Sequence, residues 1–368
     1  MIGPLLRGSR FSASRPQCRP RSHRRRGTDD GAVAFHDYWY IVAESRELTP
    51  GSVISRCVLD EWLVCYRGAD GTPALLRDRC LHRGGRLSDG TVRQGALRCP
   101  YHGWTYDGAG TVISVPSMSE PPGLCNPPYP MAERDGYVYV RLNRQAATDI
   151  LPFAMPHYQE PGWKHLRLQN RFASNVANCV ENFIDIPHTA FVHAGIFRRS
   201  SGERIEATVA REGGAVHVSY RNERGNLGRF QWFLNPHGEP VAHTDSFYTP
   251  NVTSVRYELA RGWVFVITSQ AVPVSDSETL VYTDLTYRFG PFTSLAAWFV
   301  RRHGQRIIDQ DIEILGRQME VIRKYGGGFT DTPADLIHRY VDSLRKAVAQ
   351  GEDPRALPRL QSEIEFRI

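Results

Sequence analysis

Long apolar runs are missing from this 368-residue sequence, and so are several motifs that would define a function on their own. No stretch of about 18 apolar residues occurs, so we expect no membrane span. No Gly-x-Gly-x-x-Gly follows a predicted strand, and a flavin- or nicotinamide-binding domain is therefore not expected. The seven cysteines are an odd number, and four of them lack metal-like spacing. This pattern excludes a disulfide framework and favours a reducing cytoplasm.

Acidic residues are missing from the first 26 positions, which hold eight arginines. The rest of the chain has 37 Lys and Arg against 39 Asp and Glu, a net charge of −2, so the overall charge of +6 belongs to this segment. Transit peptides and nucleic-acid-binding tails share such a composition. We expect residues 1–34 to form a disordered basic extension, and the folded body to bind neither nucleic acid nor membranes.

The sequence predicts two domains, residues 35–150 and 151–368. The first contains short β-branched and aromatic runs separated by turns, which predict a small all-β domain. The second predicts a mostly antiparallel sheet flanked by helices, with Ser174 as the cap of the first helix. Its expected strands cover 204–210, 215–220, 230–234, 253–259, 263–268 and 280–289, and its expected helices cover 174–186, 294–323 and 333–349. The predicted fold class is therefore α+β.

Two Cys–His pairs lie in the first domain, Cys80 with His82 and Cys99 with His102. Two thiolates and two imidazoles suit a [2Fe–2S] cluster, with the cysteines on one iron and the histidines on the other, but they also suit tetrahedral Zn²⁺. The spacing alone does not choose between them. Glycines follow each pair and let the backbone approach the site, and Pro100 stiffens the second loop. These features favour the cluster.

A second group of candidate ligands lies at Asp185, His188 and His193. On a straight helix, positions 188 and 193 point about 140° apart, so their imidazoles can share one metal only if the helix bends or ends between them. Pro187 offers a disruption, and Gly195 can end the element shortly afterwards. Ordinary hydrogen-bonded histidines near a helix end fit the same spacing, and this alternative stays open.

A third ligand is expected from the predicted helix at 294–323. Asp311 projects about 60° from Ile308, at the flank of the helix's apolar stripe, whereas Asp309 and Glu313 project toward solvent. A carboxylate on an inward face needs a compensating charge, and Fe²⁺ can supply it. Two histidines and one carboxylate form the facial triad of non-haem Fe(II) centres that activate O₂.

Both motifs resemble those of the Rieske non-haem iron oxygenases. Cys80-Leu81-His82-Arg83-Gly84-Gly85 and Cys99-Pro100-Tyr101-His102-Gly103-Trp104 are similar to the two ligand loops of Rieske proteins. Glu181-Asn182-Phe183-Ile184-Asp185-Ile186-Pro187-His188, with His193 after it, is similar to the mononuclear iron motif of the family. The resemblance covers roughly residues 36–345.

The resemblance implies ligands for two iron centres. Cys80, His82, Cys99 and His102 would hold a Rieske [2Fe–2S] cluster, and His188, His193 and Asp311 a mononuclear Fe(II). It also implies that Asp185 relays electrons, through a hydrogen bond to His102 of a neighbouring subunit in a head-to-tail homotrimer.

The resemblance also implies a terminal oxygenase that monohydroxylates or O- or N-demethylates an aromatic or other apolar small molecule. A separate NAD(P)H reductase, with or without a ferredoxin, would supply the electrons. A ring cis-dihydroxylating α subunit is the alternative within the family, and a zinc-stabilised binding module or an electron carrier is the alternative outside it. Histidines without ligand spacing, such as His243 and His303, are expected to be surface or packed residues. The candidate pocket residues are Phe230, Trp232, Phe233, Phe247, Tyr248 and Trp263.

Overall fold

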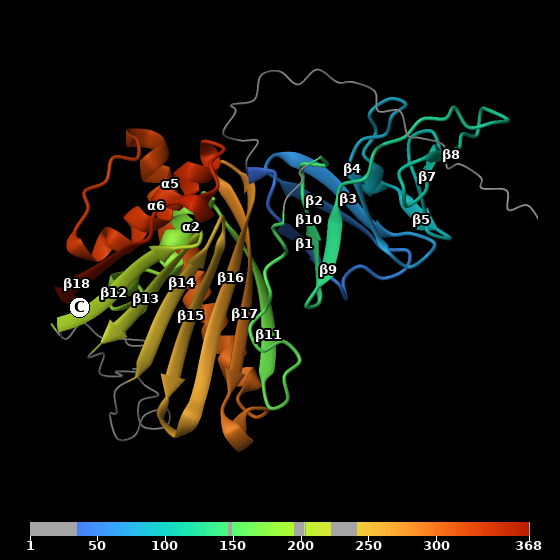
Figure 1. Cartoon of the computed structure of the whole chain (residues 1–368). Coiled ribbons are helices and arrows are strands. Elements are labelled where there is room, and N and C mark those ends of the chain that lie inside the picture. Colours follow the sequence, from blue (N-terminus) through green and yellow to red (C-terminus); the bar gives the residue numbers. More distant parts are fainter. Residues whose placement is uncertain (1–34, 146–148, 195–201, 203, 222–240, 368) are drawn as a thin grey trace, which may run out of the picture.

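The computed structural model of the chain describes residues 35–145, 149–194, 202, 204–221 and 241–367. Figure 1 shows two parts: three small sheets built from residues 40–140, and one large sheet with helices gathered on one face. Every strand pair in the described residues is antiparallel. The predicted α+β class is confirmed.

The three small sheets surround two apolar cores. Their orders are β1-β10-β9, β2-β3-β4 and β5-β6-β7-β8. Tyr40 and Tyr139 are fully buried in one core, and Tyr66 and Leu97 in the other. The strands are β1 (Tyr40–Glu44), β2 (Val53–Val58), β3 (Glu61–Arg67), β4 (Pro73–Arg77), β5 (Thr91–Arg93), β6 (Ala96–Arg98), β7 (Thr105–Tyr106), β8 (Val112–Ser114), β9 (Met131–Arg134) and β10 (Tyr137–Val140).

The large sheet has eight strands in the order β11-β17-β16-β15-β14-β13-β12-β18. Between β12 and β17 the chain makes a simple meander, in which each strand pairs with the next. Side chains of alternate residues therefore face the helices, and cross-strand neighbours form rows on that face. The strands are β11 (Lys164–Phe172), β12 (Arg204–Glu212), β13 (Ala215–Arg221), β14 (Ala242–Tyr248), β15 (Val252–Leu259), β16 (Trp263–Ser275), β17 (Glu278–Arg288) and β18 (Leu360–Arg367).

In the described part of the chain, four α-helices accompany this sheet: α2 (Val176–Phe183), α3 (Ile186–Thr189), α5 (Ala297–Tyr325) and α6 (Leu336–Ala349). The buried stripe of α5 includes Ile308, Leu315 and Met319, as its apolar periodicity predicted. Gly326 ends this helix in a backbone conformation (φ 89°) that favours glycine. No helix in the described ranges is both long and apolar enough to cross a bilayer.

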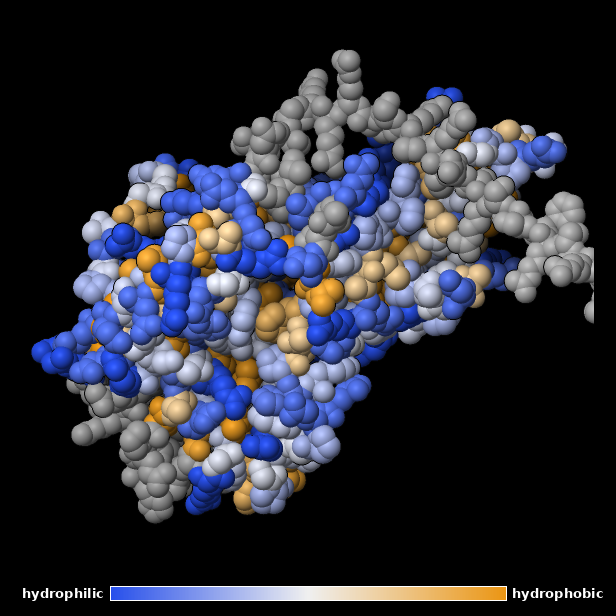
Figure 2. All heavy atoms as spheres, viewed as in Figure 1, coloured by the Kyte–Doolittle hydropathy of each residue, from blue (hydrophilic) through white to orange (hydrophobic). Residues whose placement is uncertain are grey.

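The two parts pack directly against each other through buried side chains. Leu280 and Tyr282 of the large sheet belong to the same apolar core as Tyr139 of the small one. The Tyr137 hydroxyl donates to the buried Asp284 carboxylate at 2.6 Å, and Arg167 Nε donates to the same carboxylate at 3.1 Å. Figure 2 shows apolar side chains along this junction and mixed polar surface around it.

One local expectation is wrong. Asn175, not Ser174, caps α2: its side chain accepts from Asn178 N–H at 2.8 Å, whereas Ser174 is buried and its hydroxyl accepts from the Asn178 side chain. The expected strand at 230–234 and the expected extension at 1–34 lie outside the described residues. The proposed boundary at residue 150 stays a prediction, and Met155, just beyond it, is buried in the core that contains Tyr139.

Candidate functional site

The two Cys–His loops have the same backbone hydrogen bonds. Cys80 N–H donates to the carbonyl of Gly85, five residues on, and Cys99 N–H donates to that of Trp104, also five residues on. Gly84 and Gly103 each donate back to the cysteine carbonyl of their own loop, at 3.0 and 3.1 Å. Both glycines have φ of +72°, which L-residues rarely adopt. The two Cys–His loops therefore have the same backbone conformation.

The side chains of these loops converge. The His82 and His102 rings lie 4.5 Å apart, both exposed, and Trp104 stacks on His82 at 5.1 Å between ring centres. Cys80 and Cys99 are buried, and burial raises the pKa of the Cys99 thiol. Two buried sulfurs beneath two exposed imidazoles suit a [2Fe–2S] cluster with mixed ligands.

The side chain of Tyr106 contacts the first Cys–His loop. Its hydroxyl lies 3.3 Å from Cys80 Sγ and accepts from Leu81 N–H at 2.9 Å. Trp104 also packs against the site, through its stacking on the His82 ring. The hydroxyl contact to the sulfur was not anticipated.

The second group of ligands forms where one helix ends and another begins. Helix α2 ends at Phe183, and Asp185 caps the short helix α3, accepting from His188 N–H at 3.1 Å. Pro187 lies in the first turn of α3, so it starts a helix here and does not bend one. The helix ends at Thr189, before His193, as two histidines that share a metal require. Gly195, the expected terminator, lies outside the described residues.

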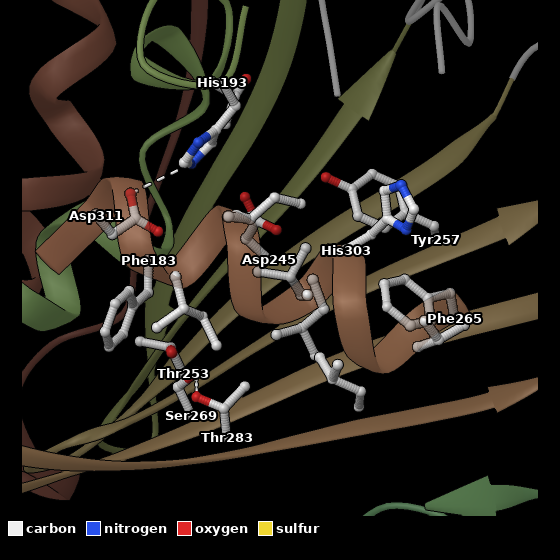
Figure 3. Close-up of a pocket in the computed structure, with 18 of the residues that line it drawn as sticks. Phe183, His193, Asp245, Thr253, Tyr257, Phe265, Ser269, Thr283, His303 and Asp311 are labelled. Carbon is white, nitrogen blue, oxygen red and sulfur yellow. Dashed lines mark hydrogen bonds and ion pairs between the residues drawn. The ribbon is translucent and has the colours of Figure 1, made fainter. Parts of the chain in front are cut away.

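Asp311 projects from α5 toward His193 (Figure 3), and its carboxylate also lies near the His188 ring. One ligand atom from each of His188, His193 and Asp311 lies within 4.8 Å of the others. Asp311 Oδ1 lies 3.2 Å from His193 Nε2 and 3.7 Å from His188 Nε2, yet it is buried and lacks a well-aligned hydrogen bond. Burial alone would lower the pKa of His193, but the Asp311 carboxylate raises it. A cation bound by all three residues would compensate the buried Asp311 Oδ1 for the hydrogen bond that it lacks.

Outer contacts hold the two imidazoles. His193 Nδ1 contacts Gln310 Oε1 at 3.0 Å, and His188 Nδ1 contacts Asp185 Oδ2 at 3.2 Å. Such contacts orient metal-binding histidines and leave Nε2 available. Asp185 therefore lies beside the triad. Gln310 was missed, because one Gln beside an Asp on a helix carries no spacing signal.

The triad opens onto a cavity of about 550 Å³ between the large sheet and α5. Its walls are mostly apolar, with Phe183, Phe265 and Ile308 among them, and this size and character suit a small organic molecule. Of the six aromatics expected here, Phe247, Tyr248 and Trp263 do not line it, while Phe230, Trp232 and Phe233 lie outside the described residues. Tyr248 packs on Phe153 instead, because strand alternation turns it to the other face.

Two family models match the chain. The Rieske [2Fe-2S] domain matches residues 38–131, and the vanillate O-demethylase oxygenase C-terminal domain matches residues 172–353. Together they contain all four Cys–His ligand candidates and the whole triad.

Curated relatives match over part of their length. The dicamba O-demethylase oxygenase component of Stenotrophomonas maltophilia is 32% identical over 176 residues, which are 46% of this chain and 51% of that protein. A putative toluene-4-sulfonate monooxygenase system iron-sulfur subunit of Comamonas testosteroni is 27% identical over 54% of this chain and 55% of that protein. The match thus spans about half the length of these relatives.

Solved structures share the fold along nearly their whole length. Dicamba monooxygenase bound to dicamba matches with a TM-score of 0.76 at 19% identity, covering 86% of this chain and 98% of that one. NdmA of Pseudomonas putida CBB5, solved with caffeine, matches with a TM-score of 0.74 at 20% identity, covering 90% and 98%. At this identity the likeness shows the fold alone.

Proposed function

Because the chain belongs to the Rieske non-haem iron oxygenase family, we propose that it is the terminal oxygenase of a multi-component system. It monohydroxylates an apolar small molecule, or removes a methyl group from its oxygen or nitrogen. The observation that carries the proposal is the triad of His188, His193 and Asp311, gathered at the wall of an apolar cavity. The named relatives, a demethylase and a monooxygenase component, support this reaction class.

We assign the iron ligands by position. Cys80, Cys99, His82 and His102 hold the Rieske cluster of a domain at 35–150. His188, His193 and Asp311 hold the mononuclear iron of a domain at 151–368. When bound, the two groups supply single electrons and O₂ activation, respectively. A reducing compartment such as the cytoplasm would keep the Cys80 and Cys99 thiolates available as cluster ligands.

The residues of the chain prepare the pocket for this chemistry. Its apolar walls exclude water from the reacting carbon and bind a flat apolar substrate by burial. Gln310 and Asp185 hold the imidazoles so that both Nε2 atoms face Asp311. His188, His193 and Asp311 all line the cavity, so a substrate bound there would lie beside an iron that these residues would hold.

We propose that electrons cross between subunits. In Figure 1, β5 and β7, whose neighbouring loops carry the Cys–His ligands, lie in the part of the molecule away from the large sheet and α2. His102 is exposed, and Asp185 keeps 20% of its side chain exposed beside His188. A head-to-tail homotrimer would bring His102 of one copy to Asp185 of the next. A separate reductase, with or without a ferredoxin, would reduce the cluster.

Reconstitution tests the proposal. The purified chain is combined with NADH, a surrogate ferredoxin–reductase pair and a panel of methoxyarenes, and formaldehyde is measured. We expect NADH-dependent formaldehyde release by the wild type and by His217→Ala, because His217 contacts Ser246 away from the cavity. His188→Ala should release almost none. Full turnover by His188→Ala would disprove the assignment.

A further inference from the structure

One cross-strand row of the cavity wall carries three hydroxyl groups side by side. Thr253 of β15 pairs with Ser269 of β16, and Ser269 pairs with Thr283 of β17. All three side chains line the cavity, and these residues keep 1%, 5% and 4% of their surface exposed. Directly opposed residues on neighbouring strands have Cβ atoms about 4.5–5.5 Å apart, so these three form one continuous hydroxyl row. Figure 3 shows the three side chains together.

The hydroxyl row keeps hydrogen-bonding capacity for a ligand. Ser269 Oγ and Thr283 Oγ1 lie 3.3 Å apart, so one of them donates to the other. The Thr253 hydroxyl has no hydrogen-bond partner among the described residues. Each hydroxyl has one donor and two acceptor positions, so the row can donate further hydrogen bonds and also accept them. A hydroxyl or carbonyl oxygen of a ligand matches this capacity.

The wall next to the hydroxyl row is apolar on β15, β16 and β17. One row further along these strands, Leu285, Ile267 and Val255 face the cavity. The row after that contributes Phe265 and Tyr257, which Figure 3 shows well apart from the three hydroxyl side chains. Along these strands the wall therefore changes from hydroxyl to aliphatic to aromatic side chains.

The hydroxyl row lies at the end of the sheet that carries the triad. Thr279, four residues before Thr283 on β17, donates to the Ser174 carbonyl at 2.8 Å, immediately before α2. Helix α2 packs on β15, β16 and β17, and it ends at Phe183, just before the histidine ligands of the triad. In Figure 3, Phe183 lies between Asp311 and the three hydroxyl side chains.

The direction of α5 agrees with this placement. The helix begins beyond the last residue of β17, and Gly304 packs directly against Leu285 in the aliphatic row. Because α5 contacts both β17 and β11, it runs back along the sheet, and Asp311 follows Gly304 on the side where Thr283 lies. A ligand oxygen bonded to the hydroxyl row would therefore face the triad, with the rest of the ligand over the aliphatic and aromatic rows.

The charges of the cavity favour a neutral group at this row. Among the described lining residues there is no lysine or arginine. Each carboxylate among them lies beside a histidine, Asp185 with His188, Asp245 with His243, and Asp311 with His193. A carboxylate bound at the row would lose its hydration without gaining a cationic side chain. A hydroxyl or carbonyl oxygen costs less to bury and gains a hydrogen bond.

We propose that Thr253, Ser269 and Thr283 bind a hydroxyl or carbonyl oxygen of the substrate. The flat apolar remainder of the molecule lies on the aliphatic and aromatic rows, so the substrate reacts at a carbon close to its own polar group. The position of the reacting carbon rests on the proposed function, whereas the binding of the oxygen does not. A purely structural role explains the row less well, because valine has the shape and strand preference of threonine without a hydroxyl to bury.

Equilibrium binding tests the oxygen site without turnover. The iron-loaded full chain is kept anaerobic without a reductase, and fluorescence measures its affinities for 2-naphthol, 2-methylnaphthalene and 2-naphthoate. Thr253→Val should lower the affinity for 2-naphthol about tenfold, because the buried hydroxyl of the ligand loses a partner. The affinity for 2-methylnaphthalene, which has a methyl group in place of the hydroxyl, should stay within twofold of wild type. The wild type should bind 2-naphthoate more weakly than 2-naphthol.

Three further variants compare the ratio of the 2-naphthol and 2-methylnaphthalene affinities. Thr253→Ser retains the hydroxyl and should retain the wild-type ratio. Thr283→Val should lower the ratio severalfold, and it serves if Thr253→Val does not fold. Thr268→Val is the matched control, because it removes a buried hydroxyl next to Ser269 that does not line the cavity, and it should leave the ratio unchanged.

Several binding results would overturn the oxygen site. They are a wild type that binds neither 2-naphthol nor 2-methylnaphthalene, a wild type that prefers 2-naphthoate, and an unchanged ratio in both valine variants of the row. A ratio that falls as far in Thr253→Ser or Thr268→Val as in Thr253→Val would overturn it as well.

Turnover tests the position of the reacting carbon. With the surrogate ferredoxin–reductase pair, O₂, NADH and a proton convert a methyl ether into the free hydroxyl compound, formaldehyde, water and NAD⁺. We expect 3-methoxy-2-naphthol, whose hydroxyl is next to the methoxy group, to release formaldehyde severalfold faster than 6-methoxy-2-naphthol, whose hydroxyl is on the other ring. Faster release from 6-methoxy-2-naphthol would overturn the orientation. The expected binding ratios without formaldehyde from either isomer would support the oxygen site and count against the proposed reaction alone.

Discussion

The two candidate iron sites are built in opposite ways. All four ligands of the first lie within 23 residues of sequence, on two copies of one hydrogen-bonded loop. The ligands of the second are 123 residues apart at their extremes, since His188 and His193 surround the end of α3 while Asp311 comes from α5. The first site depends on local backbone geometry, and the second depends on how a helix packs on a sheet.

This difference decides which changes harm each site. Backbone strain in one loop should damage the first site and spare the second. Loss of one inward side chain on α5 should remove the metal from the second site and spare the first, because α5 packs on the large sheet and the Cys–His loops belong to the other part of the molecule (Figure 1). Five variants, taken in four predictions, test this separation from the largest expected effect to the smallest.

Asp311→Ala should have the largest effect. It removes the carboxylate that completes the triad, and metal-derived stabilisation is worth several kcal/mol, so turnover should fall by roughly 10³-fold or more. The visible spectrum of the cluster should not change. Glu313→Ala, an exposed position on the same helix, is the matched control and should keep wild-type turnover. A cluster lost together with activity in Asp311→Ala would show that the two sites are not independent.

Gln310→Leu should weaken the mononuclear site without emptying it. The variant removes the 3.0 Å contact to His193 Nδ1, and loss of such an orienting partner typically costs about 10–100-fold in metal affinity. The measurement is iron retention during dialysis against graded chelator. Gln318→Leu, exposed two turns further along α5, should retain iron like the wild type. Equal iron retention by the two variants would show that Gln310 does not contribute to iron binding.

Gly84→Ala and Gly103→Ala compare how much strain each of the two Cys–His loops tolerates. Gly84 and Gly103 share a φ of +72°, so each change should cost about 1–2 kcal/mol in stability of the loop. A Cβ at Gly103 would also lie 2.8 Å from the Pro116 ring, whereas at Gly84 the nearest atom is 3.7 Å away, so Gly103→Ala should cost about 1 kcal/mol more. Urea titration followed by loss of the cluster's visible absorbance measures both. A larger effect of Gly84→Ala would contradict the packing argument.

Tyr106→Phe should have the smallest effect. It removes a hydroxyl 3.3 Å from Cys80 Sγ, and hydrogen bonds to cluster sulfurs stabilise the reduced form, so the reduction potential should fall while the fold persists. Tyr66→Phe removes a buried hydroxyl of the same apolar core that donates to the Asp107 carbonyl, and should leave the potential unchanged. A spectroelectrochemical titration compares the two. Equal potentials in both variants would exclude a role for this contact.

Local chemistry explains what the sequence could predict. The Cys–His loops were predictable because the ligands and their glycines are neighbours in the chain. Asp311 was predictable because the stripe of α5 indicates its inward face, and Asp309 is exposed as expected. His188 and His193 required a break in the helix, and the sequence indicated one, although Pro187 begins α3 and does not disrupt α2.

Tertiary contacts explain what it could not predict. Gln310, His243 and Asp245 are ordinary polar residues until the sheet and α5 come together around the cavity. Strand β14 was missed because its cavity face carries His243 and Asp245 where an apolar pattern was expected. The error at Ser174 has a similar origin, since both Ser174 and Asn175 suit a cap and only burial excludes the first.

The central claim is that one chain holds a sulfur-ligated diiron cluster and a separate mononuclear iron. Iron analysis of the purified wild type, combined with electron paramagnetic resonance after anaerobic dithionite and nitric oxide, tests it most directly. We predict about three irons per chain, a reduced-cluster signal and a nitric oxide signal in the wild type. Asp311→Ala should lose the nitric oxide signal and keep about two irons. A colourless zinc protein, or a wild type with two irons and no nitric oxide signal, would contradict it.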